Sequence, residues 1–371
     1  REIRTPIIEH SEVFHRDSEG SDMVTKETYD FEDRNNRRLT LRPEGTAGVI
    51  RSYVENKLYA SQDLEKVFYI GPNFRYERPQ KGRYRQFYQF GVEAIGTVDP
   101  TLDAETVILA YDFVKRLGLK GVRVRLNTLG DDVSRKTYQD ALVAHLTPAR
   151  ETLCDDCKNR LDKNPLRILD CKVDTQNPAV LSAPVTQDYL TPDSKAYFKT
   201  VIRHLDASGI SYEINKRMVR GLDYYSHTVF EIEADIEGFG AQNVLGGGGR
   251  YQKLVKELGG PDVGGIGFAF GMERLLLALD AENITLSKDV VSDVFVVVVG
   301  DVNRKAATKL LYDLRQHGLS SDMNYTGKAF KGQFRQALKS GARHLVIMGD
   351  DEMKRGVVAV KDTTTEQQEE V

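Results

Sequence analysis

The chain has 371 residues, of which 29% are charged and 40% hydrophobic, with a formal net charge of −3. This length predicts about two or three domains, and the near-neutral charge excludes a generally basic nucleic-acid coat. The sequence contains no apolar run long enough to span a bilayer, no secretory signal at its start, and only three cysteines. We therefore expect a cytoplasmic protein without membrane contact, because a reducing compartment suits free thiols.

The first two segments predict extended structure. Residues Arg1–Val13 fit an edge strand that begins near Pro6. Residues Thr28–Leu41 fit a hairpin, whose turn at Arg34–Arg38 contains two asparagines.

The next block, RPEGTAGVIRSYVENKL, predicts a helix with Pro43 in its first turn. Its apolar residues recur at helical spacing, namely Ala47, Ile50, Val54 and Leu58. Glu44 and Thr46 lie at the start of this helix. An acidic side chain there stabilises a helix by about 0.3–1 kcal/mol, so capping is one interpretation of Glu44.

A strongly basic hairpin follows, with strands expected at about Val67–Tyr76 and Arg85–Ile95. Side chains alternate between the faces of a strand, so the hairpin has one polar face. That face carries Asn73, Arg75, Gln89, Gly91 and Glu93. A glycine between Gln89 and Glu93 leaves no side chain there, and we expect a hollow that suits a small ligand with an anionic and a cationic end. The alternative is an exposed hairpin with a charged face.

The segment FRYERPQKGRYRQFYQFGVEAIG resembles motif 2 of the class II aminoacyl-tRNA synthetases, in the version of the histidyl-tRNA synthetases. The resemblance implies that Arg75 is catalytic, that Arg83 binds ATP, and that Gln89 and Glu93 bind histidine. It makes Glu44 and Thr46, in RPEGT, acceptors for the α-ammonium group of histidine. It also makes Arg1–Val13 the end of motif 1, which builds the dimer interface of these enzymes.

Beyond the hairpin, Asp99–Pro100 predicts a turn and Asp103–Leu117 an amphipathic helix that ends at Gly118. Residues Gly121–Asn127 alternate as a strand. These elements predict an α+β domain, in which a mostly antiparallel sheet is flanked by helices. The sequence has no Rossmann glycine fingerprint and no P-loop, so arginines would have to hold ATP.

Residues from about Asp131 to Ser208 predict helices and contain three cysteines, Cys154, Cys157 and Cys171. A structural zinc ion needs four ligands, and His145 would have to be the fourth. We favour buried free thiols and expect no metal. The block resembles the helical insertion of histidyl-tRNA synthetases, which implies a contact with the acceptor stem of tRNA.

The segment VRGLDYYSHTVFEIEA predicts a strand from Tyr224 and closely matches the histidine-specific motif of the family. The resemblance implies that Arg220 is a catalytic cation at the α-phosphate. It also implies that Tyr225 and Glu93 hold the imidazole, since a phenol and a carboxylate can satisfy both ring nitrogens. The alternative makes Tyr224 and Tyr225 core aromatics and Arg220 an exposed charge.

Two glycine-containing segments follow. In NVLGGGGRYQKLVKELGG, the glycines allow close approach to a ligand, and Tyr251, a candidate for histidine binding, is expected to begin a helix through Leu258. Residues Gly264–Leu279 predict a strand that becomes a helix at Gly271. This segment resembles motif 3 of the family, which implies that Arg274 is catalytic and contacts ATP.

After Ser287 the pattern becomes β-α-β-α-β-β, which predicts a small α/β domain with a mainly parallel sheet. The stretch Lys328–Arg343 has five basic residues and no acidic one. Two interpretations fit it, a solvated helix face and part of the anticodon-binding domain that class II synthetases share.

The resemblance implies a class II catalytic domain at residues 1–130 and 209–286, a helical insertion at 131–208 and an α/β anticodon-binding domain at 290–371 that is truncated at its end. We expect a homodimeric histidyl-tRNA synthetase that uses L-histidine, ATP, Mg²⁺ and tRNA(His). The leading alternative is a non-catalytic relative, either a regulatory subunit or a sensor domain that binds histidine or uncharged tRNA. The abrupt ends suggest that a first and a last helix are missing.

Overall fold

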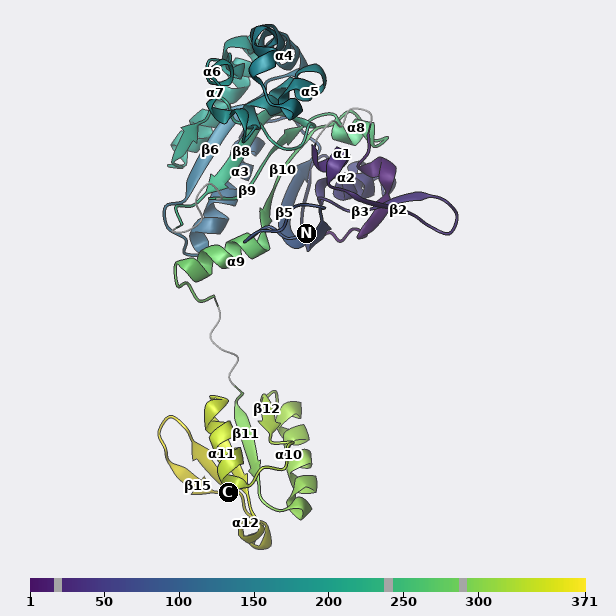
Figure 1. The fold of residues 1–371 in the computed structure, drawn as a ribbon. Coiled ribbons are helices and arrows are strands. Elements are labelled where there is room, and N and C mark those ends of the chain that lie inside the picture. The colour runs from purple at the N-terminus through teal and green to yellow at the C-terminus, as the bar shows by residue number, and fades with distance from the viewer. Residues whose placement is uncertain (17–21, 237–242, 287–291) are drawn as a thin grey trace. The chain divides into compact units, whose positions relative to one another are not determined.

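The computed structural model describes residues 1–16, 22–236, 243–286 and 292–371 (Figure 1). The chain forms two compact units, Arg1–Ile284 and Thr285–Val371. Each unit has its own sheet and its own buried core.

A seven-stranded sheet dominates the first unit, in the order β4-β5-β10-β9-β8-β6-β7. Every neighbouring pair is antiparallel except β6 and β7. The strands are β4 (Glu65–Phe74), β5 (Gln86–Ile95), β6 (Arg123–Thr128), β7 (Tyr212–Ile214), β8 (Tyr225–Glu233), β9 (Val244–Tyr251) and β10 (Gly265–Gly271). The predicted antiparallel sheet with flanking helices is confirmed.

One face of this sheet is covered by three helices, α3 (Pro100–Arg116), α7 (Pro192–Ala207) and α9 (Met272–Ala281). The core between them is apolar and includes Val107, Val201, Phe230, Phe268 and Leu275. Because side chains alternate along a strand, the residues next to these core positions point to the opposite face. That opposite face carries the polar groups of the central strands.

A small sheet with the order β1-β3-β2 precedes the main one. Its strands are β1 (Ile8–His10), β2 (Tyr29–Glu32) and β3 (Arg38–Leu41), with α1 (Asp22–Lys26) between the first two and α2 (Thr46–Glu55) after the third. The predicted hairpin is therefore confirmed, and β1 is an edge strand that pairs with β3.

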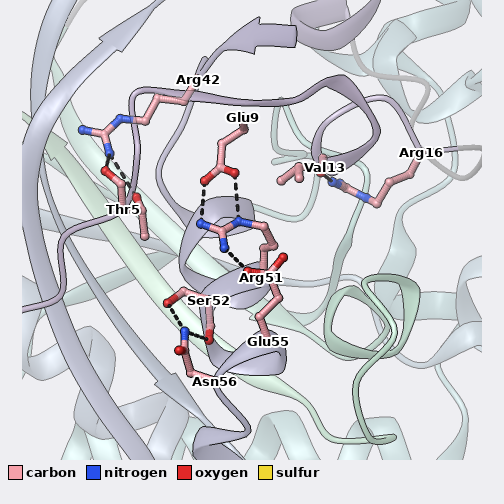
Figure 2. A network of polar contacts seen from close by, with 9 residues as sticks. All are labelled: Thr5, Glu9, Val13, Arg16, Arg42, Arg51, Ser52, Glu55 and Asn56. Atoms are coloured by element: carbon pink, nitrogen blue, oxygen red, sulfur yellow. Dashed lines mark hydrogen bonds and ion pairs between the residues drawn. The ribbon is translucent and has the colours of Figure 1, made fainter. Parts of the chain in front are cut away.

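Two arginines fasten this N-terminal region together (Figure 2). Arg51 on α2 binds Glu9 on β1 through two contacts of 2.8 and 2.9 Å. Arg42 donates to the backbone oxygens of Thr5 and Pro72, at 3.1 and 2.7 Å. Bidentate arginine contacts fix geometry as well as adding energy. They hold the loop between Arg42 and α2 in place.

Three predicted local structures differ from those observed. Helix α2 begins at Thr46, so Pro43 lies in the preceding loop. Asp99–Pro100 is not a separate turn, because the Asp99 side chain accepts from the Thr101 N–H at 2.7 Å and caps α3. The glycine run is part of strand β9, and the helix after it, α8, covers only Leu254–Glu257.

The residues between β6 and β7 are mostly helical. They form α4 (Asp132–Leu146), α5 (Asp155–Lys163), α6 (Pro178–Leu181) and α7, joined by short 3₁₀ turns. Helices α4–α6 gather at one end of the unit (Figure 1) around their own core, which includes Tyr138, Leu142, Cys157 and Ile168. Helix α7 instead packs on the core of the main sheet.

The second unit has a five-stranded sheet in the order β12-β11-β13-β14-β15. Only β11 pairs in parallel, with β12 and β13, so the sheet is mixed rather than mainly parallel. Its elements are β11 (Val294–Val298), α10 (Arg304–Gln316), β12 (Ser321–Met323), α11 (Phe330–Lys339), β13 (His344–Met348), α12 (Asp350–Arg355), β14 (Ala359–Asp362) and β15 (Gln368–Glu370).

A buried ion pair joins the sheet of the first unit to α3. Arg250 on β9 and Asp103 on α3 are both fully buried, with nitrogen–oxygen distances of 2.8 and 2.5 Å. Arg250 also donates to the Thr97 carbonyl oxygen at 2.8 Å. A charge buried without its partner is strongly destabilising.

We therefore expect Asp103→Ala to lower the free energy of unfolding of the first unit by about 3–5 kcal/mol. Hydrogen exchange of the β9 and α3 amides, followed in urea by mass spectrometry, measures this change for that unit alone. The matched control is Asp112→Ala, which removes an exposed ion pair with Arg116 on the same helix. Equal losses in the two variants would contradict the role assigned to the buried pair.

Candidate active site

A cavity of about 460 Å³ opens on the polar face of the central strands. It is lined by residues from β4, β5, β8, β9 and β10, from the starts of α2 and α9, and from the insertion. Every site residue predicted from the sequence lines it, namely Glu44, Thr46, Arg75, Arg83, Gln89, Glu93, Arg220, Tyr225, Tyr251 and Arg274. Segments far apart in the sequence thus converge on one cavity.

Glu93 lines this cavity and is only 1% exposed. Its carboxyl oxygens accept hydrogen bonds from the Thr46 hydroxyl at 2.7 Å and from the Tyr251 hydroxyl at 2.9 Å. Burial raises the pKa of Glu93 to about 8, although both hydrogen bonds act in the opposite direction. The carboxyl of the ligand-free protein therefore holds its proton at pH 7.

Only a glycine fits opposite this carboxyl. Gly267 on β10 pairs with Glu93 across the sheet, and a Cβ atom at Gly267 would lie 2.0 Å from Glu93 Oε2. The glycine run of β9 also lines the cavity, through Gly246, Gly247 and Gly249. These glycines keep the cavity open above the sheet.

The predicted reason for the hollow was partly wrong. The gap at Gly91 is filled by the ring of Tyr69 on β4, since a Cβ at Gly91 would lie 2.2 Å from Tyr69 Cζ. Gly91 and Tyr69 are paired across β4 and β5. The space for a ligand lies instead over the glycines of β9 and β10.

Tyrosines form one wall of the cavity. The rings of Tyr224 and Tyr225 are 4.8 Å apart, and that of Tyr251 is 5.8 Å from Tyr224. Burial raises the pKa of Tyr225, so its phenol keeps its proton and can donate. His227, two residues on, has a φ of +44° at a shift in the pairing of β8 with β9. Such a bulge bends a strand locally, next to the tyrosines.

Four arginines line the cavity. Arg75 donates to the Pro43 carbonyl oxygen at 2.8 Å, and Arg83 forms an ion pair with Glu77. Arg220 forms an ion pair of 2.5 Å with Glu231 on β8. Arg274 donates to the Val244 carbonyl oxygen at 2.7 Å.

The arginines influence one another. Burial lowers the pKa of Arg274, and the charges of Arg83 and Arg75 lower it further. The negative charge of a bound polyanion would offset this repulsion. Guanidinium groups suit such a ligand, because each can donate two parallel hydrogen bonds to phosphate oxygens.

The capping contact of Glu44 is present, because its carboxyl accepts from the backbone N–H groups of Thr46 and Ala47 at 2.5 and 2.8 Å. The same carboxyl lines the cavity. Gln89 Oε1 accepts from the Asn73 side chain at 2.7 Å, which fixes the amide beside the cavity.

Several lining residues were not predicted. Tyr69, Tyr224, Glu231 and Glu273 line the cavity, as do Asp170 and Lys172 from the insertion. The alternation of side chains along β8 places Glu231 on the same face as Tyr225, so the sequence pattern could have identified Glu231 as a residue that lines the cavity. Glu273 lies in the first turn of α9, and its carboxyl accepts from the Tyr88 N–H at 2.8 Å and reaches the cavity.

The cysteines lie outside this cavity. The sulfur atoms of Cys154, Cys157 and Cys171 and a carboxyl oxygen of Asp174 are within 4.8 Å of one another. His145, the fourth ligand considered from the sequence, is not among them, and its Nε2 atom lies 2.9 Å from the Ala179 carbonyl oxygen.

The chain is similar to known proteins over its whole length. Residues 1–275 match the family model "Histidyl-tRNA synthetase", and residues 293–371 match the model "Anticodon binding domain". Histidine–tRNA ligases of Acholeplasma laidlawii and Bacillus subtilis are 55% and 51% identical, and each comparison covers 100% of this chain and 88% of the relative.

A solved structure gives the same result. The apo histidyl-tRNA synthetase of S. aureus matches with a TM-score of 0.83 and 41% identity, over 100% of this chain and 88% of that one. Across the described ranges, no helix combines the length and the apolar character that a membrane crossing requires.

We expect one glutamate of the ligand-free protein to titrate with a midpoint of about 8. Carboxyl carbon NMR of glutamate-labelled protein measures this, with Glu93→Gln as the assignment control. Because the folded-state pKa exceeds the ordinary value of 4.5, the contribution of Glu93 to stability is complete below pH 4.5 and is lost as the pH rises through about 8. A spectrum in which every glutamate titrates near its ordinary value would contradict the assigned environment.

Proposed function

The chain belongs to the histidyl-tRNA synthetase family, and from this premise we propose how its cavity performs the reaction. The protein is an aminoacyl-tRNA ligase, which joins histidine to tRNA with ATP as a substrate. The carboxylate of histidine attacks the α-phosphate of ATP, which gives histidyl-adenylate and releases pyrophosphate. A ribose hydroxyl of the terminal tRNA adenosine then attacks the adenylate and releases AMP.

We assign the triphosphate to the arginine side of the cavity. Arg75 and Arg220 would contact the α-phosphate, Arg274 the β- and γ-phosphates, and Arg83 the same polyanion. The first step spreads negative charge over phosphoryl oxygens, so it depends on positioning and on fixed positive groups. The charges of Arg83 and Arg75 lower the pKa of Arg274, so these three cations lie near one another, which supports this assignment.

Mg²⁺ would share the charge of the triphosphate. Magnesium prefers oxygen ligands and is usually bound by one or two carboxylates together with substrate phosphates. The carboxylates of Glu231 and Glu273 line the cavity and fit this requirement. Glu231 lies 2.5 Å from Arg220, next to the proposed phosphate position.

We assign the imidazole of histidine to the space between Glu93 and Tyr225. Tyr251 donates to Glu93 and would thereby orient the carboxyl toward the ring. Glu44 and Thr46 would bind the α-ammonium group, and Gln89 would orient the same end of the substrate. The Thr46 hydroxyl also donates to Glu93, so it would couple the two ends of the amino-acid site.

The alternative function is a non-catalytic regulatory or sensor subunit. Such a protein has no need of a complete set of ATP-binding arginines. Here Arg75, Arg83, Arg220 and Arg274 all line the same cavity as Glu93. This convergence is the observation that carries the catalytic proposal.

We further propose the division of the chain and its partners. Residues 1–130 and 209–286 would form the catalytic domain, 131–208 an insertion that contacts the acceptor stem of tRNA(His), and 290–371 the anticodon-binding domain. The exposed side chains of Ile7, Ile8, Phe68 and Ile70 support a homodimer through the N-terminal segment and β4. The free cysteines suit a cytoplasmic location.

The proposal is tested by Arg220→Ala, which we expect to lower the rate of histidine-dependent ATP–pyrophosphate exchange by about 10²–10³-fold. The loss should appear in kcat, because the cation acts on charge that develops in the transition state. Arg203→Ala is the matched control, since Arg203 is an exposed arginine on α7 outside the cavity. Exchange at the wild-type rate in the Arg220 variant would show that its catalytic assignment is wrong.

The pKa of Glu93 generates a second prediction. At neutral pH the carboxyl of Glu93 is protonated and the imidazole of free histidine is neutral. The carboxyl can therefore donate its proton in a hydrogen bond to the unprotonated ring nitrogen. Sharing a single proton leaves no net charge in the buried site, which desolvation favours. Below about pH 6.5 the free imidazole also becomes charged, so both partners then carry a proton. Above about pH 8 Glu93 is a carboxylate and the ring is neutral, so the buried site then carries one net negative charge, which desolvation disfavours.

We therefore expect kcat/KM for histidine in the exchange reaction to follow a bell-shaped pH profile, with its alkaline limb centred on about pH 8. In Glu93→Gln the alkaline limb should disappear, because the amide does not titrate. An alkaline limb that is unchanged in this variant would contradict the assignment of the imidazole to Glu93.

A further inference from the structure

The insertion contains a cluster of soft and anionic side chains that the synthetase reaction does not use. Cys154 is the N-cap residue of α5, and Cys157 lies in its first turn. Cys171 directly follows the 3₁₀ turn Pro165–Asp170, and Asp174 begins the next 3₁₀ turn, Asp174–Gln176. The sequence spacing is therefore Cys-x₂-Cys, thirteen residues, then Cys-x₂-Asp. Two such pairs separated by a short stretch are typical of zinc sites.

The four donor atoms lie close enough together to bind one tetrahedral metal ion. All lie within 4.8 Å of one another, and the sulfur atoms of Cys154 and Cys171 are 3.8 Å apart. With a zinc–sulfur bond of about 2.3 Å, the edge of a tetrahedral site is about 3.8 Å. Cys157, Cys171 and Asp174 are at most 5% exposed. Four ligand atoms thus surround one small, shielded position.

Backbone groups support this arrangement. The Asp174 N–H points to the Cys171 sulfur at 3.5 Å, and the Asp174 carboxyl accepts from the Cys154 N–H at 3.0 Å. These contacts orient ligands from two segments toward each other, as outer contacts do in metal sites. The N-terminal end of α5 adds a favourable field for thiolates.

We propose that Cys154, Cys157, Cys171 and Asp174 bind a structural Zn²⁺ ion. Three thiolates and one carboxylate complete the tetrahedral coordination that structural zinc requires. Binding transfers the three thiol protons to solvent and involves no change of oxidation state. The expectation of plain buried thiols came from seeking the fourth ligand at His145, whereas the fold supplies Asp174.

The metal would hold the insertion against the wall of the active site. The segment between the two ligand pairs contacts the residues that carry the predicted catalytic groups. Asn164 donates to the Asp223 carboxyl at 2.7 Å, and Arg167 donates to the Arg220 carbonyl oxygen at 3.3 Å. Asp170 and Lys172, which flank Cys171, line the active-site cavity. A zinc ion that joins the two ends of this segment would therefore restrict its motion beside Arg220.

The first test is the metal content of the full-length chain. Protein without a polyhistidine tag, purified under reducing conditions and without chelator, is analysed by inductively coupled plasma mass spectrometry. We expect about one zinc ion per chain. After removal of zinc, Co²⁺ should give the intense visible bands of a tetrahedral site and a thiolate charge-transfer band. A chain that holds iron instead of zinc, or binds neither Zn²⁺ nor Co²⁺, would overturn the proposal.

Variants at the fourth ligand sharpen the test. Asp174→Ala should lower zinc affinity by at least about tenfold, whereas Asp174→Cys should keep the ion and raise the charge-transfer absorbance of the Co²⁺ form by about one third, from three thiolates to four. His145→Ala is the control and should retain zinc. Unchanged zinc affinity in Asp174→Ala, or loss of zinc in His145→Ala, would refute the ligand set.

The positioning role has its own measurement. Removal of zinc under reducing conditions should speed amide exchange of residues 154–176 by about tenfold or more and leave the second unit unchanged, because only the insertion loses a cross-link. Equal exchange with and without zinc would refute this role. The metal content does not depend on aminoacylation, so the failure of either proposal would leave the other standing.

Discussion

The buried carboxyl of Glu93 is the constraint on which the rest of the site depends. It joins three parts of the chain, because it accepts from Thr46 at the start of α2 and from Tyr251 at the end of β9, and lies against Gly267 on β10. Burial of this group is costly unless it keeps a proton or gains a partner. A basic ring with one free lone pair would satisfy that need, and in this way the fold would select an imidazole side chain.

The arginines around the same cavity would place the second substrate. Each is held by a neighbour that leaves part of the guanidinium available, Arg75 by the Pro43 carbonyl oxygen, Arg220 by Glu231 and Arg274 by the Val244 carbonyl oxygen. Such anchoring lowers the entropy lost when a phosphate binds. Arg42 and Arg51, drawn in Figure 2, do not line the cavity themselves. Their contacts in the N-terminal region hold the loop that carries Pro43 and Glu44.

Much of this could be predicted from the sequence. The basic hairpin, the RPEGT block and the segment around Tyr225 each carry a local pattern, and the antiparallel sheet followed from the alternation of their strands. Packing between distant segments could not be predicted. The ring of Tyr69 fills the gap at Gly91, and the glycine run of β9 became a strand because it lies between β8 and β10.

The cysteine cluster also depends on packing that the sequence did not reveal. The sequence suggested that three thiols lacked a fourth ligand, because Asp174 is an ordinary acidic residue until the 3₁₀ turns bring it to the sulfur atoms. The sheet of the second unit likewise departs from a mainly parallel one because β14 and β15 pair antiparallel, and β15 is a short polar strand without a hydrophobic pattern. Local motifs and the family resemblance they carry therefore located ten residues that line the cavity, whereas tertiary contacts decided what each one touches.

The central claim is that one cavity holds an imidazole amino acid beside a triphosphate. ATP–pyrophosphate exchange measured separately with each protein amino acid tests it most directly. The account predicts exchange that requires histidine and is absent with glutamine, asparagine and the others, because an imidazole nitrogen is basic enough to take up the proton of Glu93 near neutral pH and an amide oxygen is not. Exchange that proceeds equally without histidine, or no exchange with any amino acid, would contradict it.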